Sequence, residues 1–147
     1  MQFANWLLDQ QRNNINFIGT ILFTDEAGFT KNGMINLHNK HVWADENPHA
    51  TIVSHHQHQF QPINIWAGII GNCLVGSFVL PERLNGQLYL EFLKDAFVDL
   101  IEDLPLETRR DMYFMHDGAP PHFSVSVREH LNNVYPNRWI GRGGPIA

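Results

Sequence analysis

A short apolar segment near the end of the chain leads directly into an acidic residue and then into a turn. Residues 112–116 are mostly apolar, Asp117 follows them, and Gly118–Pro121 then breaks the segment. An apolar run of this length, bounded by Gly and Pro, is typical of a buried strand. We therefore expect a strand over Met112–His116 that presents the carboxylate of Asp117 at its end.

A second segment has the same pattern, and its aspartate lies 92 positions before Asp117. The run Phe17–Thr24 predicts a buried strand, Asp25 follows it, and Gly28 predicts a turn. Ligands gather at the carboxyl ends of strands in open α/β sheets, and paired carboxylates there suit Mg²⁺ or Mn²⁺, which prefer oxygen ligands. The alternative is that Asp25 and Asp117 each cap a turn, as strand-end aspartates often do.

The remaining segments alternate between strand and helix patterns. The apolar stripe that starts after Asn85 and stops at Pro105 predicts one long helix, and Asn32-Gly33 is a hairpin turn signal. The other expected elements are an amphipathic helix over 1–13, short strands at 34–37 and 42–44, a hairpin of 63–70 with 73–80, a helix opening at 120–121, an edge strand over 137–140 and a flexible loop over 141–145.

This order predicts a mixed α/β fold. An antiparallel three-stranded start, followed by crossover helices and added strands, fits a ribonuclease-H-like sheet with flanking helices better than a Rossmann sheet. The chain has neither a Gly-x-Gly-x-x-Gly element after a strand nor a phosphate-binding loop ending in Gly-Lys-Ser/Thr.

Composition narrows the class of protein further. The 147 residues predict a single domain. The net charge of −5 gives no support to a free-standing nucleic-acid binder, although a bound metal would bring its own positive charge.

The single cysteine, Cys73, excludes an intrachain disulfide and is expected to be a small buried strand residue. No apolar stretch approaches the ~20 residues of a membrane span, and no targeting signal is visible.

Four segments, taken in order, resemble the catalytic core of Tc1/mariner-type transposases of the DDE/DDD superfamily, which have the ribonuclease-H-like fold. The most specific element is Asp-x-Ala-Pro-Pro-His, which begins at Asp117. The four segments are Phe23–Phe29, Asn39–His49, Ile65–Ile69 and His116–His122.

The resemblance implies that Asp25 and Asp117 are the first two catalytic and metal-binding carboxylates of a site for two Mg²⁺ or Mn²⁺ ions. It implies transposon-end DNA as the partner, no membrane association, a homodimer in the full-length protein and a nuclear location for that parent. Residues 1–16 would be the end of a connecting segment, and residues 17–147 a C-terminally truncated core. The family's third acid would lie beyond Ala147, so we expect this chain to be inactive alone.

Two other functions remain open from the sequence. The chain could be a non-catalytic, domesticated or relic module that binds DNA or protein. It could also be an unrelated metal-dependent nuclease or phosphatase on a similar sheet.

Several other residues have a structural and a functional interpretation. Alternation along a strand predicts that Glu26 faces away from Asp25, and His116 is expected to pack away from the metals. For His122, capping or packing competes with a contact to a DNA phosphate. Packing is favoured for Trp43 and Trp66, a polar loop for residues 55–58, solvation for Arg138 and Arg142, and a DNA-facing loop remains open for residues 39–41 and 49.

Overall fold

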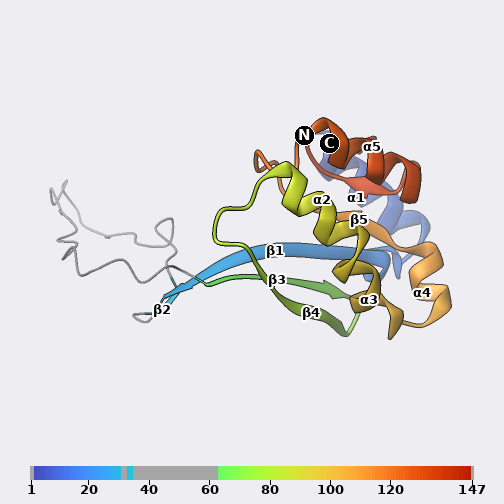
Figure 1. The fold of residues 1–147 in the computed structure, drawn as a ribbon. Helices are drawn as coiled ribbons and strands as arrows, with labels where there is room; N and C mark the ends of the chain where they lie inside the picture. Colours follow the sequence, from blue (N-terminus) through green and yellow to red (C-terminus); the bar gives the residue numbers. More distant parts are fainter. Residues whose placement is uncertain (1, 31–32, 35–62, 147) are drawn as a thin grey trace, which may run out of the picture.

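The computed structural model describes residues 2–30, 33–34 and 63–146, which form a mixed sheet flanked by helices (Figure 1). The strand order is β4-β3-β1-β5-β6, and β2 pairs with β1 outside this path. β3 is antiparallel to both β1 and β4, whereas β5 is parallel to β1 and to β6. The strands are β1 (Ile21–Thr30), β2 (Gly33–Met34), β3 (Ile63–Ile70), β4 (Cys73–Leu80), β5 (Tyr113–Met115) and β6 (Trp139–Ile140). The expected mixed α/β sheet is therefore present.

The helices follow the predicted stripes but differ in their limits. They are α1 (Gln2–Asn13), the 3₁₀ turn η1 (Phe17–Thr20), α2 (Gly86–Lys94), α3 (Ala96–Glu102), α4 (Leu106–Asp111) and α5 (Val125–Val134). The single long helix expected after Asn85 is wrong, because Asp95 leaves the helical region (φ −110°, ψ −88°) and separates α2 from α3. The helix expected to open at Pro120 instead begins after Ser124, whose backbone is extended (φ −61°, ψ 148°).

β1 begins later and extends further than expected. Residues 17–20 form η1, and the strand then continues from Ile21 through Gly28, which pairs with Asn64 of β3. The predicted turn at Gly28 is wrong because the ladder with β3 continues past it to Phe29. Asp25 therefore lies in the middle of β1 rather than at its end.

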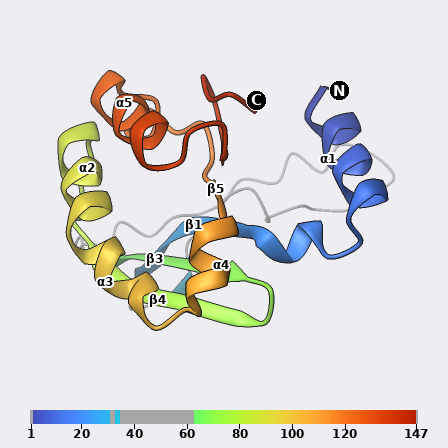
Figure 2. The same cartoon turned by 90° about the vertical axis from the view of Figure 1, so that its right-hand side faces the viewer.

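Alternating side chains of β1 enter two separate apolar cores. Leu22 packs with Phe114 and Trp66 in the larger core, which α2, α3 and α5 cover. Ile21 packs on the opposite face, where Phe3 and Trp6 of α1 contribute side chains. Figure 2 shows α2 and α3 on one side of the sheet and α1 on the other.

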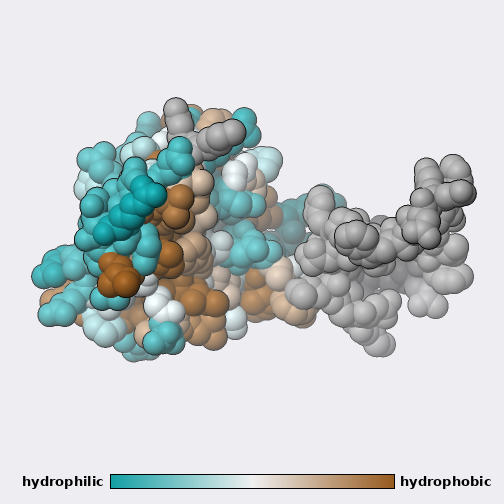
Figure 3. All heavy atoms as spheres, turned by 180° about the vertical axis from the view of Figure 1, so that it is seen from behind, coloured by the Kyte–Doolittle hydropathy of each residue, from teal (hydrophilic) through white to brown (hydrophobic). Residues whose placement is uncertain are grey.

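The face that α1 partly covers keeps exposed apolar side chains. Seen from behind, the molecule shows a band of apolar surface across its centre (Figure 3). Apolar residues of the sheet with more than a third of their surface exposed are Phe23, Phe29, Ile63, Ile69, Leu74 and Val79. Asp25 alternates with Phe23 along β1 and therefore belongs to this open face.

Two smaller expectations are wrong. Cys73 is exposed, because it is the first residue of β4 beside the Gly71-Asn72 turn. The loop over 141–145 is held by backbone hydrogen bonds, in which Gly141 donates to Ile146 and Gly144 donates to Gly141. Its glycines allow the chain to turn back onto β6 rather than leave it free.

Other expectations are confirmed or lie outside the described residues. The 63–70/73–80 hairpin, the edge strand at Trp139–Ile140 and the buried position of Trp66 are confirmed. The expectations for residues 35–62, including Trp43 and the histidines at 55–58, fall outside the described part of the chain. None of the described helices is long and apolar enough to cross a membrane. The division at residue 16 stays a prediction.

Candidate metal site at the β1–β5 pair

Asp117 lies two residues beyond the end of β5, at the start of a tight turn. Its Oδ1 accepts a hydrogen bond from the backbone N–H of Ala119 at 2.9 Å, as aspartates commonly do at turns. The backbone N–H groups of His122 and Phe123 then both donate to the carbonyl of Ala119. The turn therefore brings the side chain of His122 back to the end of the strand.

Asp25 lies on β1, the strand next to β5 in the sheet. β1 and β5 are parallel, and the last residues that pair between them are Phe23 and Met115. Asp25 and Asp117 each lie two residues further along their own segment. The hydroxyl of Thr24 donates to the carbonyl of Met115 at 2.7 Å and joins the two segments there. The parallel pairing thus brings the two segments that carry the predicted site residues side by side, although they are far apart in sequence.

The carboxylate of Asp25 faces the open side of the sheet. It accepts a hydrogen bond from the N–H of Glu26 at 2.8 Å. It also lines a largely apolar hollow of about 490 Å³, together with Phe23, Ala27 and Ile69. Asp25 is exposed, so a ligand can reach its oxygens from this side.

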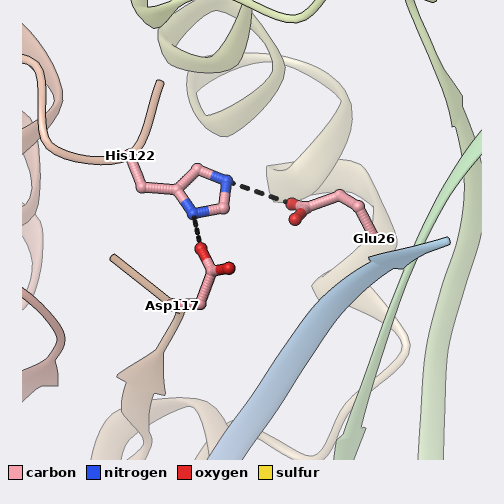
Figure 4. A group of neighbouring side chains, drawn as sticks. All are labelled: Glu26, Asp117 and His122. Atoms are coloured by element: carbon pink, nitrogen blue, oxygen red, sulfur yellow. Dashed lines mark hydrogen bonds and ion pairs between the residues drawn. The ribbon is translucent and has the colours of Figure 1, made fainter. Parts of the chain in front are cut away.

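Asp117 belongs to a close cluster of ionisable side chains. The second carboxylate of this cluster is that of Glu26, not that of Asp25. Ligand atoms of Glu26, Asp117 and His122 all lie within 4.8 Å of one another (Figure 4). Glu26 faces away from Asp25, as alternation predicted, but it is not solvated: its side chain is only 16% exposed. This cluster was not predicted, although the alternation at Glu26 and the turn before His122 are both visible in the sequence.

His122 lies between the two carboxylates. Its Nδ1 is 2.6 Å from Asp117 Oδ1, and its Nε2 is 3.2 Å from Glu26 Oε1, an ion-pair distance without hydrogen-bond alignment. Burial disfavours the charged ring, but the hydrogen bonding and charge of Glu26 and Asp117 outweigh burial and raise the pKa of His122. His122 is buried, so packing is confirmed, but its principal polar contact is Asp117.

The buried rings of His116 and Tyr89 pack against the ring of His122. His116 stacks on His122 with ring centroids 4.9 Å apart, and its packing role is confirmed. The ring of Tyr89 lies 4.2 Å from that of His122, and its hydroxyl lies 3.3 Å from His116 Nδ1. Burial, with the charges of Glu26 and Asp117, raises the pKa of Tyr89 well above its ordinary value. The hydroxyl of Tyr89 therefore stays neutral, and its ring forms one side of the cluster.

Arg138 and Arg142 are held by the protein. Arg138 donates to the carbonyls of Arg110 and Met112. The guanidinium of Arg142 lies 4.5 Å from the ring centroid of Phe123. The expectation of a simply solvated charge is therefore wrong for Arg138, whereas Arg142 is exposed as expected.

Acidification from pH 6.5 towards pH 4 is expected to destabilise the fold. Burial, followed by the charge of His122, lowers the pKa of His116 to about 4. An unfolded chain would take up this proton near pH 6.5, so the free energy of unfolding should fall by roughly 2–3 kcal/mol across this window. His122 acts oppositely: its raised pKa contributes stability below about pH 6.5, and this is lost as the pH rises through its folded-state pKa.

Urea unfolding at several pH values measures this dependence. His116→Phe keeps an aromatic ring but removes the titrating group, so its stability should vary less between pH 6.5 and pH 4. A variant with the same pH dependence as the unaltered chain would contradict the assignment to His116.

The residues present fit a hard divalent cation. Both hydrogen bonds that the structure gives Asp117 go to Oδ1, and among the described residues no protein group bonds to Oδ2. Asp25 adds exposed carboxylate oxygens at the same level, and oxygen donors suit Mg²⁺ and Mn²⁺. Asp25 and Asp117 could therefore hold a cation between them, with Glu26 and His122 behind Asp117.

Comparison with solved structures identifies the fold. The chain superposes on the catalytic domain of Mos1 mariner transposase (TM-score 0.63, 17% identity, 95% of this chain and 55% of that one). It also superposes on that domain with raltegravir and Mg (0.62, 17%, 95% and 56%) and on the Mos1 mariner paired-end complex with Mn (0.65, 19%, 95% and 39%). The sequence matches no protein-family model and no curated protein.

These similarities confirm the ribonuclease-H-like fold class, the fold of the Mos1 catalytic domain. At below 20% identity in these three superpositions, they establish the fold alone. The chain spans 39% to 56% of the length of these solved chains.

Proposed function

We propose that this chain is part of the catalytic core of a Tc1/mariner-type DNA transposase. The observation that supports this most directly is that Asp25 and Asp117 each lie two residues beyond the last pair of the parallel β1–β5 register, in a chain with the fold of the Mos1 catalytic domain. The four motif segments of the sequence, in the same order as in the family, point to the same function.

The reaction class is metal-dependent cleavage and rejoining of DNA phosphodiesters. Bound Mg²⁺ or Mn²⁺ would activate the attacking oxygen and stabilise the leaving oxygen. In this chain, Asp25 and Oδ2 of Asp117 would hold the cation, and Glu26 and His122 would keep Asp117 in place. Mos1 structures with Mg and with Mn are consistent with these cations.

The partner would be transposon-end DNA, bound by the full-length parent as a homodimer in the nucleus. The Mos1 structures include a paired-end complex with a left transposon end and a strand transfer complex, which supports DNA as the partner. The net charge of −5 suggests that other parts of the parent supply most of the basic surface.

The gene sequence around this reading frame provides the first test. We expect an acidic residue, in a Pro-Asp-type element, some three dozen residues beyond Asp117. A chain extended to include this acid should nick DNA in the presence of Mg²⁺, and its Asp117→Asn variant should not. The absence of any such acid would favour the non-catalytic module instead.

The 147-residue chain alone is expected to show no strand cleavage. Two carboxylates hold a cation less firmly than three, and the two-metal geometry requires the third ligand. A supercoiled-plasmid nicking assay with Mg²⁺, with the extended chain as positive control, measures this. Robust Mg²⁺-dependent nicking by the short chain would contradict the need for a third acid.

A further inference from the structure

Three side chains from separate segments form a compact cluster beside the β1–β5 pair. Glu26 comes from β1, Asp117 from the end of β5, and His122 from the turn before α5. Each nitrogen of the imidazole faces one carboxylate oxygen (Figure 4). An ionised carboxylate only accepts hydrogen bonds, so Nδ1–H of His122 donates to Asp117.

The ring of His122 is held firmly, whereas Asp117 is exposed. His122 is 2% exposed, and its ring packs against those of Tyr89 and His116, with centroids 4.2 and 4.9 Å away. The side chain of Asp117 is 62% exposed, and apart from His122 only the N–H of Ala119, among the described residues, bonds to it. A buried, immobile donor therefore sets the orientation of an exposed carboxylate.

This orientation has a consequence for cation binding. The N–H groups of His122 and Ala119 both bond to Oδ1 of Asp117, which directs Oδ2 away from the cluster. Hydrogen-bond partners behind a ligating carboxylate orient it, and their loss typically weakens metal binding by about 10- to 100-fold.

We propose that His122, with Glu26 behind it, is a positioning residue that holds the Asp117 carboxylate in its cation-binding orientation. The proposal rests on the proposed function, since it requires Asp117 to be a cation ligand. His122 itself does not contact the cation. Both of its nitrogens are used, one towards each carboxylate.

Two substitutions of His122 separate its contacts. The amide nitrogen of Asn corresponds in position to Nδ1, so His122→Asn keeps a donor to Asp117 and loses the contact to Glu26. The amide nitrogen of Gln corresponds to Nε2, so His122→Gln keeps the Glu26 contact and loses the one to Asp117. Both variants remove the buried ring, so they share its loss of packing.

Mn²⁺ titration calorimetry on the 147-residue chain tests the proposal. We expect His122→Gln to weaken binding by about tenfold or more, and His122→Asn to stay within about threefold of the unaltered chain. Equal affinities in the two variants would overturn the proposal. If either variant fails to fold, Glu26→Gln replaces the pair: an approximately threefold weakening supports positioning, and unchanged affinity overturns it.

Failure of the underlying function gives a different result. If the unaltered chain binds no Mn²⁺, or if Asp117→Asn binds it equally well, the proposed metal site is wrong and the positioning role falls with it.

Imidazole ¹⁵N shifts add a readout independent of metal: the Nδ1 signal of His122 should change in Asp117→Asn and remain unchanged in Asp25→Asn. An Nδ1 signal unaffected by Asp117→Asn would overturn the positioning contact itself.

Discussion

Replacing Asp117 with Asn is expected to abolish measurable Mn²⁺ binding by this chain, and Asp25→Asn should do the same. Each substitution removes the negative charge of one of the two proposed carboxylate ligands, which lie two residues beyond the last pair of the β1–β5 register. An amide keeps the shape of the side chain but is a much weaker ligand for a hard cation. Isothermal titration calorimetry at neutral pH measures the loss directly.

The fold should remain nearly intact in both variants. Asp25 and Asp117 are exposed, and exposed substitutions usually change stability by less than about 0.5 kcal/mol, although loss of the His122 contact adds to this for Asp117. Asp99→Asn, on the exposed side of α3, is a matched control that removes the same charge away from the site. Unchanged Mn²⁺ affinity in both site variants would refute the metal site.

Replacing Trp66 with Ala is expected to be the most destabilising single change in the sheet. Its side chain is fully buried and contacts the rings of Phe92 and Phe97, with centroids 5.0 and 5.7 Å away. Its indole N–H has no hydrogen-bond partner among the described residues, so the expected loss is one of packing. Removing a buried Trp typically costs about 3–5 kcal/mol, a large part of a small domain's stability.

Urea unfolding monitored by circular dichroism measures this cost. Val79→Ala on β4, where the side chain is 62% exposed, is the control and should change stability by less than about 0.5 kcal/mol. If the alanine variant is too unstable to purify, Trp66→Phe should still lose roughly 1–2 kcal/mol. A loss below that of Val79→Ala would mean that Trp66 does not anchor the core.

Much of the local structure could be predicted from apolar periodicity. The hairpin of β3 and β4, the strand before Asp117 and the buried stripe of Tyr89, Phe92 and Phe97 follow directly from it. The break at Asp95 could not be predicted, because the stripe continues across it. α4 was missed because none of its residues is buried, so it has no apolar stripe to detect.

The candidate site was predicted in part. Apolar runs that lead into aspartate predicted two neighbouring strands, and β1 and β5 do pair, although a shared metal site for Asp25 and Asp117 stays a prediction. The prediction that Asp25 ends its strand was wrong, since β1 continues along β3. The role of His122 was missed, because its contact with Asp117 depends on how the Pro-Pro turn folds back.

The sequence by itself determined the hairpin of β3 and β4, the strand before Asp117 and which residues alternate on each face of β1. Such periodicity is local: it specifies that Asp25 and Glu26 face opposite sides but not what either side meets. Only the tertiary structure decided the parallel register of β1 with β5, which places the segments that lead to Asp25 and Asp117 side by side. It also decided that a buried imidazole links Glu26 to Asp117. These contacts join segments about 90 residues apart, and their geometry depends on the packing of the whole sheet and its helices.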